Sequence, residues 1–489
     1  MGHVETAAPD LRVQHPRSLF IDGAWADPST DRVLEIVSPH TEQVFMTFAD
    51  ASEADMDRAV AAARRAFDVG PWPRMTPAER GAILLKMADI IRGRLPELAA
   101  AWTAQVGAPI SLTTHSVAQA PLLFEYYARM VMDAPEYEER LRDDGRVARI
   151  VREPVGVVAA ITPWNAPLVL LCYKLAPALA AGCTVVAKPS PETPVDAYII
   201  AESAEAAGLP PGVLNVLPAG REVGDYLIRH PSIDKISFTG STAAGKHIAQ
   251  VGAGRLARVS LELGGKSAAI VRDDADLEHT LKSLAPYSMP ITGQVCFSLT
   301  RVLASRKRMP EVLDAYVSVI SKLNVGDPAD PATHMGPLTM QRQLDRVEGY
   351  IASGVAGGAR LVCGGGRPKH CNSGFYIEPT VFADVDMSMQ IAQEEIFGPV
   401  VSFVTYDDDA DAIAKANATD YGLHGAIYTA DPEVGYRMAR QVRSGSLTIN
   451  GLIVDPKMPF GGFKQSGIGR EGGPEGLDLY HETKTIYFA

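Results

Sequence analysis

The sequence predicts an α/β fold built around a largely parallel sheet. Three runs rich in β-branched and small apolar residues support this, and each is followed by a glycine or proline turn and a helix-like segment. The runs are residues 155–161, 184–188 and 235–238. Continuous apolar strands are typical of parallel sheets covered on both faces. Their carboxyl ends should meet at one edge of the sheet, where open α/β folds bind ligands.

Two amphipathic helices are predicted before these strands. Apolar residues recur at helical spacing between Met56 and Phe67, which predicts the first helix. Thr76 and Glu79 have the spacing of a capping box, and Pro77 stands at the first helical position. These three residues therefore predict where the second helix begins.

The turn that follows the run ending at Phe238 is the first candidate ligand site. Residues 239–246 read TGSTAAGK, which is neither a GxGxxG motif nor a Walker A motif. Such a strand-to-helix turn can direct backbone N–H groups and a helix N-terminus at a phosphate. Ser241 and Thr242 would equally suit an ordinary N-capped helix, so the turn alone leaves both interpretations open.

Composition indicates a globular enzyme-sized protein that acts on small molecules. The chain has 489 residues, of which 46% are hydrophobic, and can bury more than one core. Its net charge is −12, with 46 basic against 58 acidic residues. A nucleic-acid or anionic-membrane partner would call for a basic excess, so we expect neither.

Cysteine usage and hydropathy predict a cytoplasmic location. The five cysteines form no CxxC pair and no secretory signal peptide precedes them, which favours a reducing compartment. The longest apolar tract, residues 166–183, is interrupted by Lys174 and Pro177 and is expected to be buried in the fold, not in a membrane. Residues 1–6 match the loose N-myristoylation pattern, but so short a pattern recurs by chance.

Seven ordered motifs identify a family. The motifs are PWN at 163–165, KPS at 188–190, FTGS at 238–241, LELGGK at 261–266, GQVC at 293–296, EEIFGP at 394–399 and PFGGFKQSG at 459–467. With these motifs the chain resembles the aldehyde dehydrogenase superfamily over nearly its whole length.

Cys296 is the predicted nucleophile. A thiolate adds readily to an aldehyde carbonyl, and the resulting thiohemiacetal can release hydride to leave a thioester. An arbitrary cysteine is usually buried and inert, as we expect for Cys172 and Cys183 in the apolar tract. We expect Cys363 and Cys371 to lie in an exposed glycine-rich loop without function. The GQVC setting reverses that expectation for Cys296.

Three further residues complete the predicted catalytic set. Glu262 lies between two leucines, a setting that would raise its pKa toward that of a general base for thioester hydrolysis. The resemblance implies that Asn165 forms the oxyanion hole with the backbone N–H of Cys296. It also places Lys174 on the path by which a proton leaves Glu262. A turn-forming asparagine and a snorkelling lysine are the alternatives.

The resemblance also implies a nicotinamide cofactor and no metal. NAD is the expected cofactor, with NADP as a second possibility. In the NAD-preferring pattern a glutamate three residues after the ribose lysine repels a 2′-phosphate, and this chain has Pro191 there, followed by Glu192. The predicted cofactor-binding residues are Trp164, Lys188, Ser190, Gly240, Ser241, Gly245, Glu395 and Phe397.

Positions that would line the aldehyde tunnel are mostly apolar. They include no arginine for a carboxylate and no aromatic cage for a quaternary amine, so a hydrophobic aldehyde is expected. Ordinary core packing is the alternative for these residues. Leu299 is bulkier than the small residue common in the family and is expected to reshape the pocket beside Cys296. The predicted substrate residues are Leu170, Tyr173, Phe297, Leu452, Val454 and Phe460.

The resemblance implies a Rossmann-like dinucleotide-binding domain, an α/β catalytic domain and a small β oligomerisation unit. The expected limits are 1–131 with 153–264, then 265–466, and finally 132–152 with 467–489. The Asp143-Asp144-Gly145 turn predicts a hairpin, with residues 485–488 as its partner strand. Exposed strands of this kind invite pairing, so a homodimer or homotetramer is expected.

These expectations favour NAD(P)-dependent oxidation of an aldehyde to the carboxylic acid through a cysteine thiohemiacetal and thioester. Two alternatives stay in view. A CoA-acylating relative would transfer the acyl group to a thiol instead of water, although such relatives usually lack the base that Glu262 supplies. A catalytically silent protein with this fold would have no need of Cys296, Glu262 and Asn165 together.

Overall fold

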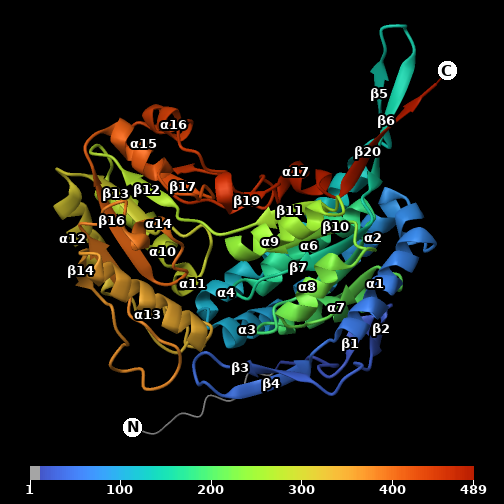
Figure 1. Ribbon diagram of the computed structural model, residues 1–489, viewed down its shortest axis with the longest axis horizontal. Coiled ribbons are helices and arrows are strands. Elements are labelled where there is room, and N and C mark those ends of the chain that lie inside the picture. Colours follow the sequence, from blue (N-terminus) through green and yellow to red (C-terminus); the bar gives the residue numbers. More distant parts are fainter. Residues whose placement is uncertain (1–10, 489) are drawn as a thin grey trace.

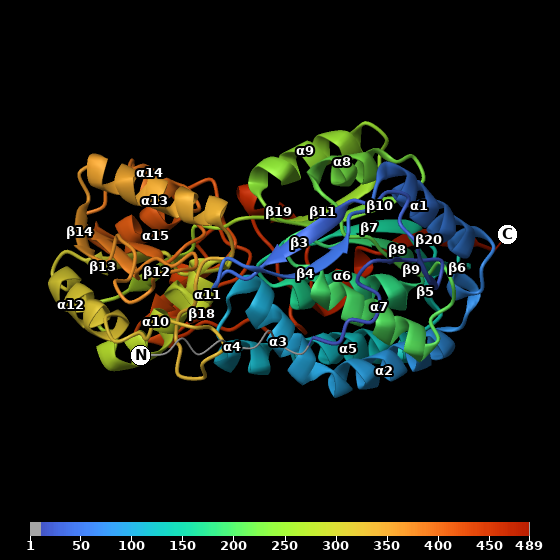
Figure 2. The same ribbon diagram turned by 90° about the horizontal axis from the view of Figure 1, so that it is seen from below.

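The computed structural model describes residues 11–488. Within them, two large β-sheets with their covering helices lie side by side (Figures 1 and 2). The predicted α/β class is confirmed. The match to the N-myristoylation pattern lies outside the described residues. None of the helices in residues 11–488 combines the length and the apolar character that crossing a bilayer requires.

The first sheet has eight strands. Five neighbouring strands, β11, β10, β7, β8 and β9, are parallel, as predicted for β7, β8 and β10. In spatial order the strands are β19 (Gly467–Ile468), β11 (Arg258–Glu262), β10 (Lys235–Thr239), β7 (Val157–Ile161), β8 (Thr184–Lys188), β9 (Leu214–Val216), β1 (Leu19–Ile21) and β2 (Ala24–Ala26).

Helices cover both faces of this sheet (Figure 2). Val157 and Ala159 of β7 face one apolar cluster, while Val158 and Ala160 face another, so the strand is buried on both sides. One face carries α1 (Glu53–Asp68), α8 (Arg221–Arg229) and α9 (Thr242–Ala253). The other carries α6 (Pro167–Ala181) and α7 (Val195–Ala207), backed by α2 (Pro77–Gly93), α3 (Leu95–Val106), α4 (Ile110–Ser116) and α5 (Gln119–Asp133).

Both predicted amphipathic helices are present. The helix predicted between Met56 and Phe67 is α1, and its buried face includes Met56, Ala59 and Val60. Helix α2 begins at Pro77 with the predicted capping box, in which the Thr76 hydroxyl accepts from the backbone N–H of Glu79. A short 3-10 helix, η1 (Trp72–Arg74), joins the two.

The second sheet has seven strands, parallel except for β14. In spatial order they are β14 (Arg360–Cys363), β15 (Thr380–Ala383), β16 (Val400–Tyr406), β13 (Arg301–Ser305), β12 (Ala268–Val271), β17 (Gly425–Tyr428) and β18 (Thr448–Ile449). Its helices are α10 (Leu277–Ser288), α11 (Pro290–Gly293), α12 (Met309–Ile320), α13 (Gln341–Ala356), α14 (Gln390–Gln393), α15 (Asp409–Asn417) and α16 (Pro432–Ala439).

A three-stranded sheet projects from the body as an arm (Figure 1). Strand β5 (Tyr137–Leu141) and β6 (Val147–Pro154) form the predicted hairpin, and β20 (His481–Tyr487) pairs with β6 as its predicted partner. Strand β19 joins the first sheet by pairing with β11, so the C-terminal segment begins outside the arm. The predicted domain limits stay a proposal, supported by which segments share a sheet.

The remaining elements are short. A separate hairpin is formed by β3 (Val33–Val37) and β4 (Val44–Ala49). Near the C-terminus, η2 (Lys464–Ser466) precedes β19, and α17 (Gly473–Asp478) precedes β20. Cys363 lies at the end of β14 and is partly buried, so the expectation that it lies in an exposed loop is wrong. The three glycines that follow Cys363 favour a loop, so the sequence does not show that the strand extends to this residue.

Candidate active site

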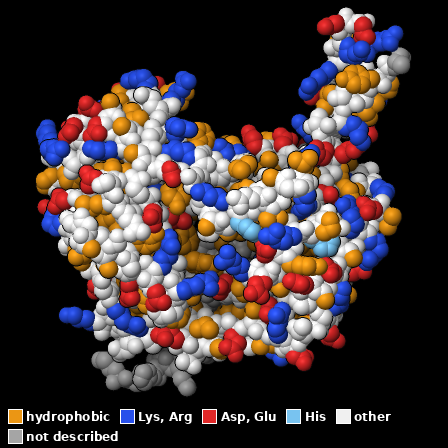
Figure 3. Space-filling model, viewed as in Figure 1, with side chains coloured by type: hydrophobic (Ala, Val, Ile, Leu, Met, Phe, Trp, Pro, Cys, Tyr) orange, Lys and Arg blue, Asp and Glu red, His pale blue; other side chains and the backbone are white. Residues whose placement is uncertain are grey.

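The predicted site residues gather where the two large sheets meet. Strands β7, β8, β10 and β11 end at the carboxyl edge of the first sheet, at Ile161, Lys188, Thr239 and Glu262. The chain then enters the second sheet at Ala268, so the amino edge of that sheet follows directly. Figure 3 shows the molecule hollowed between the two halves, with hydrophobic side chains inside the hollow. The site therefore lies between one carboxyl edge and one amino edge.

Cys296 is carried by a strained loop before β13. Ile291 and Thr292 have left-handed backbones, with φ of 48° and 58°, and Gly293 follows with φ of 73°. β-Branched residues in this region are unfavourable by about 1–2 kcal/mol each. A Cβ on Gly293 would lie 2.1 Å from the carbonyl oxygen of Gly398. The loop is thus held by close packing against the EEIFGP motif, as strain at functional sites usually is.

Gln294 and Asn165 fix the backbone beside Cys296, the predicted nucleophile. Gln294 is fully buried, and its side chain accepts from the backbone N–H of Thr339 (3.0 Å) and donates to the carbonyl of Ile291 (3.0 Å). The Nδ2 amide of Asn165 donates to the carbonyl of Gln294 at 2.8 Å. Trp102 in turn donates to the carbonyl of Asn165 at 2.9 Å. Asn165 is therefore bound to Gln294, two residues before Cys296 in the chain, and its second amide N–H makes no hydrogen bond to the described residues 11–488.

The Cys296 thiol is partly buried among acidic neighbours. Burial raises its pKa far above that of a free thiol, and the carboxylates of Glu395 and Glu262 raise it further. The backbone N–H groups of Cys296 and Phe297 lower it. A Cβ on Gly265 would lie 2.4 Å from the Cys296 carbonyl oxygen, so that glycine permits the close approach. The thiol rests protonated and needs a base to become a nucleophile.

Glu262 ends β11 inside a buried cluster of charges. Its side chain is 5% exposed, and Oε2 has no hydrogen-bond partner among residues 11–488. Burial raises the pKa of Glu262 well above its ordinary value, and the Glu471 carboxylate adds to this, while Lys174 and Arg470 oppose it. The pKa direction is the one expected from the sequence, where flanking leucines predicted an apolar setting.

Lys174 connects this cluster to β10. Its ammonium group is fully buried on α6, donating to the Thr239 hydroxyl at 2.7 Å and to the Glu471 carboxylate at 2.5 Å. A buried lysine requires such partners. The contacts exclude the snorkelling alternative, because the whole side chain lies inside the protein.

The turn after β10 begins helix α9. The Ser241 hydroxyl accepts from the backbone N–H of Ala244 and caps the helix. A Cβ on Gly240 would lie 2.4 Å from the Phe238 ring, and one on Gly245 would lie 2.5 Å from Leu263. Both glycines are therefore needed for close packing, and together they leave the N-terminus of a three-turn helix facing the edge of the sheet, where a phosphate would be stabilised.

Lys188 and Ser190 lie at the carboxyl end of β8. The Lys188 ammonium donates to the carbonyls of Ala219 (2.8 Å) and Pro189 (3.1 Å). Burial lowers the pKa of Lys188 to about 8, although the nearby carboxylates of Glu192 and Asp50 raise it. The Ser190 hydroxyl donates to Glu192.

The second sheet contributes Glu395 and Phe397 to the same space. The carboxylate of Glu395 accepts from the backbone N–H of Gly265 at 3.1 Å. Burial raises the pKa of Glu395 to about 7, opposed by that N–H, Arg346 and Lys266. Phe397 meets the Trp164 ring edge-on, with centroids 5.3 Å apart. Residues from both sheets thus contact one another across the site.

Comparison with known proteins agrees with this geometry. The sequence profile described as the aldehyde dehydrogenase family matches residues 25–486. The chain is 44% identical to geranial dehydrogenase of Castellaniella defragrans, over 98% of this chain and 99% of that one.

The chain belongs to the aldehyde dehydrogenase family.

Solved structures of the family superpose closely. An aldehyde dehydrogenase of Mycobacterium tuberculosis complexed with NAD⁺ gives a TM-score of 0.95 at 45% identity, covering 97% of this chain and 98% of that one. Aldehyde dehydrogenase C of Pseudomonas syringae, a cysteine-to-alanine variant with NAD⁺ and octanal, gives 0.93 at 40% identity, covering 97% of each chain. The predicted aldehyde dehydrogenase fold is confirmed.

Five of the six predicted substrate residues of this aldehyde dehydrogenase are linked through Phe297, either by a ring contact or by a shared core cluster. Phe297 meets the ring of Phe460 at 6.2 Å and packs against two core clusters, one containing Tyr173 and the other Leu452 with Val454 beside it. Leu170 is partly buried on α6. Leu299 is fully buried in the same cluster as Leu452, so its side chain is not exposed on the surface of the pocket beside Cys296.

Sequence reasoning missed three residues of this site. Glu471, the partner of Lys174, stands alone in GREGG, without a motif that links it to α6. Gln294 belongs to the GQVC motif, but the motif does not show that its buried side chain holds the loop by hydrogen bonds to Ile291 and Thr339. Arg342 on α13 pairs with Glu192 at 2.5 Å across the two halves, and no local pattern could place these residues together.

Proposed function

We propose that this aldehyde dehydrogenase oxidises a hydrophobic aldehyde to the carboxylic acid, with NAD as hydride acceptor and water as the second substrate. The observation that carries the proposal is the convergence of Cys296, Glu262 and Asn165 at the junction of the two sheets. The family supplies the reaction class; the buried carboxylate beside the thiol supports hydrolysis over transfer to CoA.

Cys296 acts as the nucleophile. Its sulfur adds to the aldehyde carbon after Glu262 takes the thiol proton, directly or through water, and the carbonyl oxygen becomes negatively charged. The free amide N–H of Asn165 and the backbone N–H of Cys296 stabilise that oxygen. A bound nicotinamide would supply the hydride acceptor, and loss of hydride from the carbon attached to Cys296 would leave the acyl group on the sulfur as a thioester.

Glu262 then activates the water that hydrolyses the thioester. Its raised pKa suits this role, because a base with a pKa closer to the working pH binds the proton more strongly. Lys174 and Glu471 form an ion pair in the same buried cluster and offer a path for the proton to leave. The carboxylic acid is released once the thiol has been regenerated.

The cofactor residues fit a nicotinamide dinucleotide. The N-terminus of α9, behind Gly240, Ser241 and Gly245, suits the pyrophosphate. Lys188 and Ser190 lie where the adenosine ribose is expected, at the end of β8. Glu395 is assigned to the nicotinamide ribose, and Trp164 and Phe397 to the walls beside the nicotinamide. The two solved relatives contain NAD⁺, which supports NAD for this chain.

A hydrophobic aldehyde is the proposed substrate. Phe297 and Phe460 meet next to Cys296, and Leu170, Tyr173, Leu452 and Val454 complete an apolar set. The relatives named for geranial and crystallised with octanal act on or bind hydrophobic aldehydes, which supports the same class here.

The deciding experiment measures nicotinamide reduction with octanal and with betaine aldehyde, without CoA or phosphate, comparing NAD with NADP. We expect turnover of octanal with a kcat/KM at least about tenfold above that of betaine aldehyde, the scale that apolar pocket contacts provide. A strict requirement for CoA would reject hydrolysis, and a preference for betaine aldehyde would reject the substrate class.

We also propose a homodimer or homotetramer in the cytoplasm. Strands β5 and β20 are the two open edges of the projecting arm, and Leu141 and Tyr487 on them are 77% and 67% exposed. Unpaired edges with exposed apolar side chains favour pairing with another subunit. Sedimentation of the purified protein tests this, and a monomer at all concentrations would reject it. The five cysteines are free, as suits a reducing compartment.

A further inference from the structure

One ion pair joins the two halves of the molecule beside the proposed ribose site. Arg342, at the start of α13, donates from Nη2 to Oε1 of Glu192 at 2.5 Å. The other oxygen of Glu192 accepts from the Ser190 hydroxyl. The same carboxylate therefore links the KPS motif of the first sheet to a helix of the second half.

We propose that Arg342 is a specificity-determining residue that lets this enzyme bind NADP as well as NAD. The inference rests on the proposed cofactor site at Lys188 and Ser190. Pro191 stands where NAD-preferring enzymes have the glutamate that repels a 2′-phosphate. The carboxylate next to it in sequence is Glu192, and Arg342 neutralises the charge of Glu192 through an ion pair. An arriving 2′-phosphate would then meet a paired carboxylate and a guanidinium able to turn toward it.

The other charges around the site favour an anion. Lys188 donates only to main-chain carbonyls, Pro189 O and Ala219 O, so its positive charge is not paired with a carboxylate at hydrogen-bond distance. Asp50, the second carboxylate that raises the pKa of Lys188, is paired with Arg32 at 3.4 Å. Three cations, Lys188, Arg342 and Arg32, therefore stand against two carboxylates, Glu192 and Asp50, so the positive charge of Lys188 is left without a carboxylate of its own.

The Arg342 side chain is largely exposed and is held by one contact. Its side chain is 66% exposed, against 23% for Glu192, and Glu192 is its only hydrogen-bond partner among residues 11–488. A guanidinium has five N–H donors in a planar fork that suits both a carboxylate and a phosphate. Arg342 can therefore keep Glu192 and contact a phosphate, or exchange one for the other. With NAD bound, it continues to hold Glu192 in place.

Binding of adenosine 5′-diphosphate and of its 2′-phosphorylated form tests the proposal, because the two ligands differ only by the 2′-phosphate. Calorimetric titration requires neither aldehyde nor turnover. We expect the wild-type protein to bind the two within about tenfold of each other, since the contact of the 2′-phosphate with Arg342 roughly offsets its repulsion by the Glu192 carboxylate. Arg342→Met should weaken the 2′-phosphorylated ligand by about 30-fold and the other by less than about threefold.

Two further variants sharpen the result. Glu192→Gln removes the competing charge and should strengthen the 2′-phosphorylated ligand about threefold or more. Arg306→Met is the matched control, because Arg306 is also exposed and paired with one carboxylate, Asp407, far along the chain. It should change neither affinity.

A wild-type preference for the unphosphorylated ligand beyond about tenfold, or an equal loss of both ligands in Arg342→Met, would overturn the proposal. Failure of the proposed reaction is distinguishable. If both ligands bind as expected and no aldehyde is oxidised, the role of Arg342 stands and the reaction falls. If neither ligand binds, the cofactor site and this inference fall together.

Discussion

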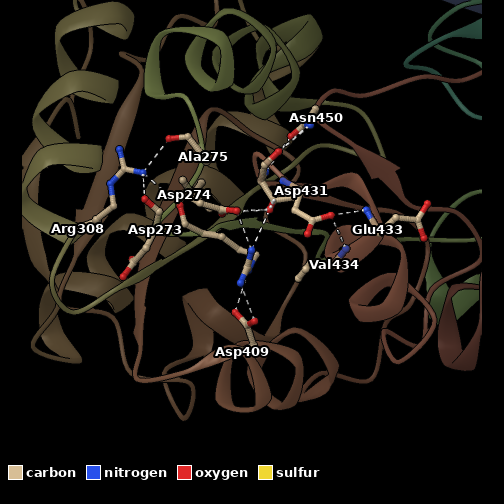
Figure 4. Close-up of polar contacts among 12 residues, drawn as sticks. Asp273, Asp274, Ala275, Arg308, Asp409, Asp431, Glu433, Val434 and Asn450 are labelled. Carbon is tan, nitrogen blue, oxygen red and sulfur yellow. Dashed lines mark hydrogen bonds and ion pairs between the residues drawn. The ribbon is translucent and has the colours of Figure 1, made fainter.

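The two large sheets share one architecture, yet their carboxyl edges differ in how polar groups are satisfied. At the carboxyl edge of the first sheet, Glu262 Oε2 and Thr162 Oγ1 are buried without a hydrogen-bond partner among the described residues. At the carboxyl edge of the second, Arg272, Asp409 and Thr429 belong to a closed network of ion pairs and hydrogen bonds (Figure 4).

The closed network joins four neighbouring strands. Arg272, directly after β12, makes a two-pronged contact with Asp409, which follows β16, at 3.1 and 3.0 Å. Its third nitrogen donates to Asp274 (3.0 Å) and to the Thr429 hydroxyl, which follows β17 (2.9 Å). Arg308, after β13, donates to main-chain carbonyls of the same segment. The ends of β16, β13 and β17 are thus each tied to the segment that follows β12.

The difference shows which edge is available for chemistry. Unsatisfied buried polar groups destabilise a protein and persist where a substrate or cofactor will use them. A satisfied network stabilises the fold and leaves no buried polar group that needs a ligand. The second sheet therefore contributes to the site through its amino edge, from which Cys296 and Glu395 reach toward the first sheet.

The largest expected effect is at the nucleophile. Replacing Cys296 by alanine should lower kcat by about 10⁴-fold or more, because no other group can form the thioester. Nicotinamide cofactor binding, followed by fluorescence quenching, should stay within about threefold of wild type. Cys371→Ala is the control, since that cysteine is partly buried outside the site and should leave kcat unchanged. Substantial turnover by Cys296→Ala would contradict the proposal that the reaction takes place at the carboxyl edge of the first sheet.

The next effect is at the base. Glu262→Gln keeps the shape of the side chain but cannot accept a proton, so kcat should fall by about 10²- to 10⁴-fold. Deacylation is the step that suffers most, and intact-protein mass spectrometry after mixing with NAD and octanal should show an acyl group retained on Cys296. Absence of any acyl adduct together with wild-type turnover would remove Glu262 from the mechanism.

Most of the carboxyl edge of the first sheet could be predicted from the sequence, because the motifs that form it are short and contiguous. Continuous apolar strands end in turns whose glycines and polar residues are adjacent in the chain, as in residues 238–241 and 261–266. The partners that complete the site are remote: Glu471 is 297 residues from Lys174, and Arg342 is 150 residues from Glu192. Such pairs depend on packing of the two halves, which no local pattern encodes.

The closed network of the second sheet was not predicted either. Arg272 and Asp274 are charged loop residues and Asp409 begins α15, and a sequence pattern alone would place all three in solvent. Leu299 illustrates the same limit in the core, because its neighbour Phe297 is partly buried against two core clusters while Leu299 is fully buried within one of them. Side-chain direction in an irregular loop follows from tertiary packing.

At the closed edge, a substitution should affect stability and not catalysis. Arg272→Met leaves Asp409 and Asp274 without their shared partner and should lower the free energy of unfolding by about 2 kcal/mol. The Arg272 side chain is only 20% exposed, so solvent screens the pair incompletely. Thermal unfolding measures the loss, with Arg306→Met as the control for an exposed pair. A large fall in kcat at unchanged stability would show that this edge also serves the reaction.

The smallest effect is the stability that Glu262→Gln should gain. Because the folded-state pKa of Glu262 is raised, the folded protein binds that proton more tightly than the unfolded chain. Its contribution to stability is therefore fully present below the unfolded-state pKa and is lost as pH rises through the folded-state pKa. Glutamine carries no charge and avoids that loss, so the variant should be more stable than wild type by about 1 kcal/mol at alkaline pH and equal to it in acid. Thermal unfolding across this pH range measures the difference, and Glu278→Gln, at an 82% exposed side chain, should show none. A variant that is less stable than wild type at high pH would mean that the Glu262 carboxylate stabilises the fold, and the contrast between an open edge kept for chemistry and a closed edge kept for stability would fail.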